Sequence, residues 1–141
     1  MNTQYPRWWN TSLTVFNRVF NADTKATMWQ KTVLQNCFYL QNSGLVQSGA
    51  EIRANDSYVV RIPASEAYIP QAEWETMQSG REGCFTLAPG DLIFKGEIPD
   101  EIESGSGNSL LERYKPDCFK IQSVYDGTGY GVLGHYMAEG V

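Results

Sequence analysis

Short runs of β-branched and aromatic residues, separated by polar or glycine-rich turns, restrict the fold of this chain more than any other feature. The first run, Leu13–Phe20, is followed by the polar turn 21–25 and by a second run, 27–34, in which apolar and polar residues nearly alternate. Such a pair is typical of a β-hairpin. The segment 36–40 is expected to extend the second strand after a bulge or a bend. Strands do not alternate with long helical segments, so a doubly wound parallel sheet is not expected.

Further strands and two short helices are predicted downstream. The strands are expected at 57–63, 84–87, 91–95, 119–125 and 132–138. The helices are expected at 70–77, which begins with a proline, and at 109–114, which Pro116 follows. Pro89 and Gly90 predict a tight turn, because proline presets one central angle and glycine supplies a positive one. The chain is therefore expected to be mainly β, a small antiparallel barrel or sandwich with one or two short helices and long loops.

The domain organisation follows from length and composition. With 141 residues, 42% of them hydrophobic, the chain suits one domain with a sizeable core. An N-terminal arm is predicted at 1–11 and a β-rich domain at 12–141. Two segments poor in large apolar residues, 41–56 and 96–108, are predicted to be long loops, and loops of that length are commonly functional or mobile.

Charge is divided unevenly along the chain. Residues 1–63 carry six basic and three acidic groups, whereas residues 64–141 carry five basic and thirteen acidic ones. This argues against a protein that grips nucleic acid along its whole length. Four acidic groups crowd into one predicted loop: Glu97, Asp100, Glu101 and Glu103. They lack the spacing of a calcium-binding loop, so the sequence predicts a solvated acidic loop that contacts a basic partner or lies beside DNA.

No set of residues in the sequence assembles a catalytic or cofactor site. Cys37, Cys84 and Cys118 form no C-x-x-C pair and are predicted to be small buried strand residues. The lone histidine, His135, is not paired with a cysteine by any motif. The stretch 129–134 matches G-x-G-x-x-G, but only seven residues follow it, too few for a dinucleotide-binding unit. We therefore predict no catalytic residue, no metal site, no cofactor and no enzymatic activity.

Two adjacent tryptophans, Trp8 and Trp9, precede the first strand. If exposed, they would form a stacking platform for a sugar or a base. If buried, they would fasten the N-terminal arm to the domain. Adjacent residues on a strand point to opposite faces, so a third arrangement buries one of them and leaves the other available to a neighbouring subunit.

The order of these segments resembles that of a known group of phage proteins. The residues that carry the resemblance are Leu13–Arg18, Trp29–Val33, Val59–Pro63, Leu87–Glu97, Phe119–Val124 with Asp126, and a terminal strand with His135. The most specific piece is Pro89-Gly-Asp-Leu-Ile-Phe-Lys-Gly-Glu97. From about residue 12 to its end, the chain resembles a family of small uncharacterised proteins of tailed phages and prophages of Gram-positive bacteria. Their genes lie among those for head and head–tail joining proteins. The 41–56 segment and the tryptophan-rich arm depart from the short members of that family.

The architecture is also similar to that of head-closure, or stopper, proteins of long-tailed phages. In those proteins a small β-barrel forms a ring below the portal and adaptor, and long loops close the channel. The resemblance implies a structural protein of the virion neck that forms a homo-oligomeric ring and contacts adaptor, tail-terminator or tail-tube proteins. Its loops and arm, Trp8 and Trp9 included, would contact neighbours, and acidic groups facing a channel would repel DNA.

Two alternatives stay open at this point. The first is a tail-completion, tail-terminator or capsid-associated protein. The second is a carbohydrate-binding module of a receptor-binding protein, in which Trp8, Trp9, Trp29 and Trp74 would form the platform. Residues 1–9 lack the apolar core of a signal peptide, and no apolar run is long enough to span a bilayer. We therefore expect synthesis in the host cytoplasm and no membrane partner.

Overall fold

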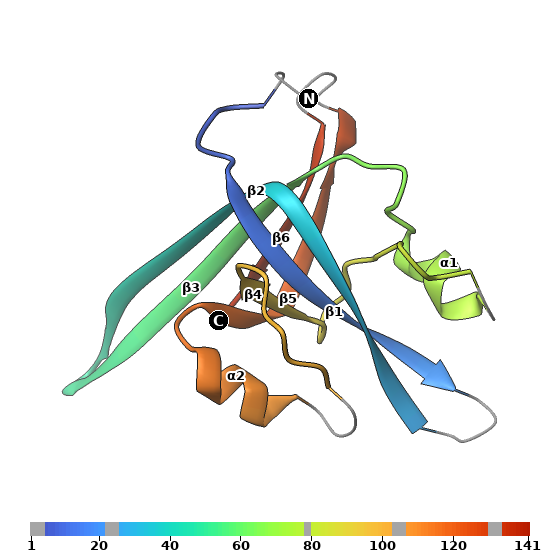
Figure 1. The fold of residues 1–141 in the computed structure, drawn as a ribbon. Helices are drawn as coiled ribbons and strands as arrows, with labels where there is room; N and C mark the ends of the chain where they lie inside the picture. The colour runs from blue at the N-terminus through green and yellow to red at the C-terminus, as the bar shows by residue number, and fades with distance from the viewer. Residues whose placement is uncertain (1–4, 22–25, 78–79, 103–106, 130–133) are drawn as a thin grey trace.

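The computed structural model describes residues 5–21, 26–77, 80–102, 107–129 and 134–141 (Figure 1). Within them, six antiparallel strands close a barrel in the order β1-β2-β3-β6-β5-β4, accompanied by two short helices. The strands are β1 (Thr11–Asn21), β2 (Ala26–Ser48), β3 (Glu51–Pro63), β4 (Leu92–Lys95), β5 (Cys118–Gly127) and β6 (His135–Gly140). The helices are α1 (Gln71–Thr76) and α2 (Asn108–Tyr114). The predicted mainly β fold, a small antiparallel barrel with short helices, is confirmed.

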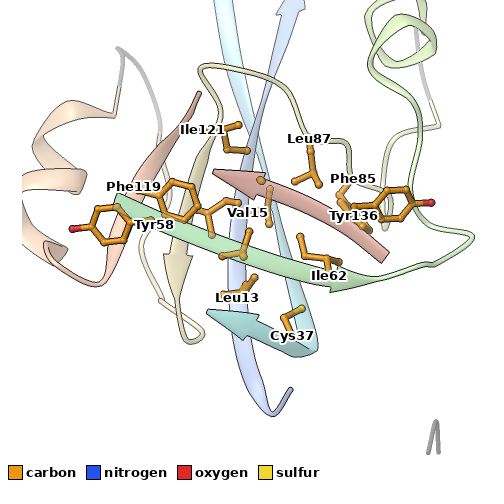
Figure 2. Packing of buried hydrophobic residues seen from close by; sticks show 13 residues of the cluster. Leu13, Val15, Cys37, Tyr58, Ile62, Phe85, Leu87, Phe119, Ile121 and Tyr136 are labelled. Carbon is orange, nitrogen blue, oxygen red and sulfur yellow. The ribbon is translucent and has the colours of Figure 1, made fainter. Parts of the chain in front are cut away.

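Two hydrophobic cores lie on opposite sides of the same strands. Val15, Ile93 and Phe119 belong to the core inside the barrel, part of which is seen in Figure 2. Their neighbours Phe16 and Phe94 belong to a second core, which α2 covers on the outside with Leu110 and Leu111. Because β4 is buried on both faces, its sequence Leu-Ile-Phe is apolar without alternation.

The irregularity between the two halves of β2 is a bulge. Leu13 pairs with Leu34, but Thr11 pairs with Cys37, so β2 holds one extra residue there. Asn36 absorbs it with a φ of +59°, a left-handed conformation that asparagine adopts more easily than most residues. The predicted bend before residues 36–40 is confirmed.

The segment 41–56 is not a loop, so that prediction is wrong. It forms the outer half of the β2–β3 hairpin, whose pairing continues to Ser48 and Glu51 and is closed by Gly49 and Ala50. Strand β3 pairs with β6 only between Tyr58 and Pro63, so the outer part of the hairpin extends beyond the barrel, as Figure 1 shows. Backbone pairing forms this hairpin. Its sequence lacks the apolar alternation by which strands are predicted.

Smaller differences concern three other segments. Residues 84–87 form no strand but a single bridge between Tyr68 and Phe85, and Phe85 and Leu87 fill the barrel interior. Strand β6 begins at His135, later than the predicted 132, and residues 130–133 lie outside the described part of the chain. The described part of 96–108 is irregular up to α2, as predicted, and residues 103–106 lie outside it.

Candidate functional site

A pocket of about 350 Å³ opens where the β1–β2 hairpin runs past the barrel. Strand β4 pairs with β1 only as far as Phe16, because the Pro89–Gly90 turn directs the chain away before Leu92. Beyond Phe16 the edge of β1 therefore faces α1 and the segment 81–91 instead of another strand. The pocket lies between these elements. Its walls include Arg18, Phe20, Thr27, Trp74, Glu75 and Arg81.

Side chains replace the missing strand along this edge of β1. The backbone N–H of Arg18 donates to Asp91 Oδ1 at 3.2 Å, and the indole Nε1 of Trp74 donates to the Arg18 carbonyl at 3.0 Å. The edge is therefore closed at Arg18 by an acidic residue on one side of the pocket and a helical tryptophan on the other.

Asp91 is the buried centre of a polar network at the base of the pocket. Its side chain is 2% exposed and accepts hydrogen bonds from Asn17 Nδ2 at 2.9 Å and from Arg18 Nε at 3.0 Å. Asn17 also donates to the Thr86 carbonyl and accepts from the Thr86 N–H, which fixes the segment before the turn. Burial raises the pKa of the Asp91 carboxyl, although the hydrogen bonds from Asn17 and Arg18 oppose that shift.

Each residue of the Pro89-Gly90-Asp91 sequence has a separate role. The Asp91 N–H donates to the Ala88 carbonyl, and Gly90 has a φ of +96°, which confirms the predicted turn. The Arg18 guanidinium lies against Gly90, where a Cβ would stand 2.8 Å from Cζ, and donates to the Pro89 carbonyl at 2.5 Å. The motif that carries the sequence resemblance is thus a turn built to receive an arginine from β1.

The remaining wall of the pocket combines aromatic and cationic groups. Arg81 Cζ lies 5.3 Å from the centre of the Trp74 ring, and its Nη2 donates to the Trp74 carbonyl at 2.7 Å. Trp74 is buried, whereas Phe20 on β1 is 64% exposed at the mouth of the pocket. A flat apolar group would find the exposed Phe20 side chain and two arginines there, a combination that favours aromatic ligands.

The two N-terminal tryptophans have different environments. Trp9 stacks on Tyr5 at 5.1 Å between ring centres and meets His135 edge-on at 5.5 Å. The Tyr5 hydroxyl donates to the Gly134 carbonyl, so the arm is fastened to the start of β6. Trp8 is 66% exposed. Trp9 therefore anchors the arm and Trp8 is presented to solvent. The pair lies at a turn and not on a strand.

The acidic segment is tied to the protein's own basic residues. Asp100 accepts hydrogen bonds from Arg113 Nη1 at 2.7 Å and from the Tyr114 hydroxyl at 2.5 Å. Glu101 lies 3.7 Å from Lys31 Nζ, whereas Glu97 is exposed. The buried Ile98 fastens the same segment to the second core. Glu103 lies outside the described residues. Glu97 and Glu101 are therefore solvated as predicted, whereas Asp100 is held by two partners of the same chain.

The cysteines occupy mostly the predicted positions. Cys37 and Cys118 are buried in β2 and β5, and burial raises the pKa of their thiols to about 12 and about 11. Cys84 is half-buried and precedes Phe85 outside any strand. Among the described residues, no three histidine, cysteine or acidic side chains gather as a metal-binding group. No helix of the described part is both long and apolar enough to cross a bilayer.

The pocket is not apparent from local sequence patterns. Pro89, Gly90 and Asp91 stand out for their turn and for the resemblance, but their partners Asn17 and Arg18 lie more than 70 residues earlier. A local signal is the adjacent polar pair Asn17-Arg18 between the apolar pairs Val15-Phe16 and Val19-Phe20.

Comparison with known proteins places the chain in a family. A family model described as a family of unknown function (DUF6751) matches residues 8–141, which include Trp8 and every residue of the pocket. No curated protein and no solved structure gives a significant match. The matched range covers nearly the whole chain, so this protein belongs to the DUF6751 family of unknown function.

Proposed function

We propose that this chain is a structural protein of the neck of a tailed phage, where it forms a homo-oligomeric ring at the head–tail connector and acts in head closure. The sequence resemblance centred on Pro89–Glu97 motivates the proposal. The observation that carries it is the combination of a closed barrel with two hairpins and an aromatic arm that extend from it. A closed barrel has a fixed shape and no free sheet edge of its own, which suits a ring subunit.

The projecting elements supply surfaces for neighbouring copies and neck proteins. The outer β2–β3 hairpin runs from residues 42 and 57 to the turn at Gly49, seven paired positions beyond the last pairing of β3 with β6. At about 3.4 Å per residue this arm is about 24 Å long. An arm of that length reaches across a neighbouring subunit or toward a central channel.

Exposed apolar side chains gather on or near these same elements. Trp8 lies on the N-terminal arm, Phe20 and Met28 lie near the end of the β1–β2 hairpin, and Leu40 lies at the base of the β2–β3 hairpin. Contiguous exposed apolar groups mark interaction sites, whereas scattered single ones are normal on a protein surface. Phe20 and Met28, on the paired strands of one hairpin, therefore support a contact with a neighbouring copy.

The net negative charge supports part of the hypothesis that acidic groups face a DNA channel. The net charge of −5 would repel DNA phosphates and let DNA pass without binding. Because Asp100 and Glu101 are paired internally, Glu97 is the described acidic group of this segment that is best placed to act on DNA.

The carbohydrate-binding alternative receives less support. It requires a platform of tryptophans, but Trp74 is buried and Trp9 and Trp29 are part-buried in packed clusters. Trp8 alone is not a platform. The tail-completion, tail-terminator and capsid-associated roles share the barrel and the projecting arms, so they are separated from head closure by location.

Cryo-electron microscopy of particles from a prophage that encodes the chain tests the proposal. We expect a ring of six-stranded barrels between the portal and the tail. An amber mutation in the gene should yield full heads that lose DNA and do not join tails. Tails of irregular length would instead indicate a terminator, and absence of the chain from the neck would refute the proposal.

A further inference from the structure

The exposed Trp8 and the pocket beside β1 are complementary in chemistry, but they lie too far apart to meet within one molecule. Trp9 and Tyr5 fasten the arm near His135 and Gly134, at the end of the barrel where β1 begins. Arg18, the first pocket residue on β1, lies seven residues beyond Thr11, or about 23 Å of strand. Trp8 is only three residues before Thr11 and its neighbour Trp9 is anchored. It therefore does not reach its own pocket.

We propose that Trp8 of one copy inserts into the pocket of the next copy, between Phe20, Trp74 and Arg81. The inference deepens the proposed ring and rests on that function only for the claim that the copies close into a ring. The occupant is a second copy of this chain, because the chain itself presents the 66% exposed indole of Trp8 directly beside Trp9, which is anchored by Tyr5.

The chemistry of the pocket suits an indole. A tryptophan side chain buries roughly 150–250 Å² in a good contact. The pocket volume of about 350 Å³ falls within the usual range for sites that receive small organic groups. Phe20, Arg18 and Arg81 are among the residues that line the space. Both arginines are already held, Arg18 by Asp91 and Arg81 by the Trp74 carbonyl, so little further ordering is needed when the indole enters.

Charge also fits the two surfaces. Arg7 is exposed beside Trp8, and α1 presents exposed Glu73 and Glu75, the latter on the pocket wall. The positive charges deeper in the pocket are compensated by Asp91 and by backbone carbonyls, so the acidic rim is what an approaching Arg7 meets. Opposite charges at the rim would set the orientation of the arm.

The geometry of the contact has a consequence for assembly. Trp8, the knob of this contact, and the pocket that receives it are different surfaces of the chain, so the interface is head-to-tail rather than two-fold. Repetition of such a contact produces a ring when the rotation closes and a filament when it does not.

Two variants and their mixture test the contact on the purified full chain by sedimentation velocity. We expect Trp8→Ala, which removes the knob, to weaken self-association by about thirtyfold or more, the effect of losing an interface hot spot of 2 kcal/mol. Thr27→Arg, which places a long cationic side chain at the exposed pocket mouth, should do the same. Tyr125→Ala, which removes an exposed aromatic group on another strand, should associate like the wild type.

A one-to-one mixture of the two variants is the decisive measurement. The Trp8→Ala chain keeps its pocket and the Thr27→Arg chain keeps its tryptophan, so the two should form a heterodimer and nothing larger. The contact is refuted if the wild type stays monomeric at its highest soluble concentration, if Trp8→Ala associates normally, or if the mixture forms no dimer. A chain that assembles through Trp8 but is absent from virions would refute the neck function alone, and neck density with a normal Trp8→Ala ring would refute this contact alone.

Discussion

Gly90 combines two constraints that can be measured separately. Its φ of +96° disfavours any side chain, and the Arg18 guanidinium occupies the space where a Cβ would stand. Gly96 has a similar φ of +84° with nothing within 4 Å of the position of a Cβ. The two glycines therefore share the backbone strain and differ in the close contact.

We expect Gly90→Ala to lower the free energy of unfolding by more than Gly96→Ala does. The positive φ should cost each variant about 1–3 kcal/mol, and Gly90→Ala should lose more because Arg18 is displaced from Asp91 and Pro89. Urea denaturation of the two variants and the wild type measures both values. Equal losses would show that the Arg18 contact contributes nothing.

The buried carboxyl of Asp91 predicts a specific pH dependence. Its pKa is raised by burial, so the folded protein binds the proton more tightly than the unfolded chain does, whose carboxyl titrates near its ordinary value of about 4. The contribution of Asp91 to stability is therefore complete below that value and falls as the pH rises toward neutrality.

The Asp91→Asn variant isolates this contribution, because asparagine does not titrate. We expect the stability of the wild type relative to Asp91→Asn to decline as the pH rises above about 4. Urea denaturation of both proteins across a pH series that begins below that value provides the measurement. A difference that rises with pH would mean that Arg18 and Asn17 outweigh burial and lower the pKa instead.

At the scale of elements, prediction succeeded where strands cover a core. β1 is rich in β-branched and aromatic residues because one of its faces packs inside the barrel and the other reaches the second core, and the bulge at Asn36 falls at a polar interruption between two apolar runs. The turn at Pro89–Gly90 was predictable because proline and glycine set its backbone angles locally. The outer β2–β3 hairpin was missed because backbone pairing alone maintains it.

The pocket was not predictable because it depends on pairs far apart in the chain. Asp91 meets Asn17 and Arg18 only after β1 and β4 have come together, and Trp74 reaches the Arg18 carbonyl from a separate helix. Of the three arrangements considered for the tryptophan pair, the structure agrees with the one that packs one of them, since Trp9 is half-buried and Trp8 is exposed. The pairing of Asp100 with Arg113 could not be predicted, because no local pattern joins the two residues.

The outer β2–β3 hairpin should be removable without loss of the fold. Replacing residues 43–56 by Asn-Gly places a two-residue turn directly after the pair Asn42 and Ser57. We expect the free energy of unfolding to change by less than about 1 kcal/mol, because the deleted segment lies beyond the barrel and a shorter connection costs less entropy to close. Far-UV circular dichroism during urea denaturation gives that value.

The same deletion separates the hairpin's function from its stability. If the hairpin contacts neighbours, as the proposed neck role requires, the shortened chain should fold but fail to complement an amber mutant of the phage. Complementation at the wild-type level would show that the hairpin is dispensable for assembly.

At the scale of the whole molecule, the two cores depend on the same strands. Adjacent residues of β1, β4 and β5 point alternately into the barrel and toward α2, as with Ile93 in one core and Phe94 in the other. Loss of packing in one core would displace β1, β4 and β5, and these same strands hold the other core together. The chain should therefore unfold as one cooperative unit.

A truncation in either core tests this coupling. Ile121→Ala inside the barrel and Leu111→Ala under α2 each remove a buried aliphatic group and should cost about 2–5 kcal/mol. In a background in which Trp8, Trp9 and Trp74 are replaced by phenylalanine, tryptophan fluorescence reports on Trp29 beside the second core, and far-UV circular dichroism reports on all strands. In both variants the two signals should change at the same urea concentration, below that of the wild type. If the fluorescence of Leu111→Ala changed first while the strand signal persisted, the second core would be a separate unit, and the strands would not couple the two sides of the barrel.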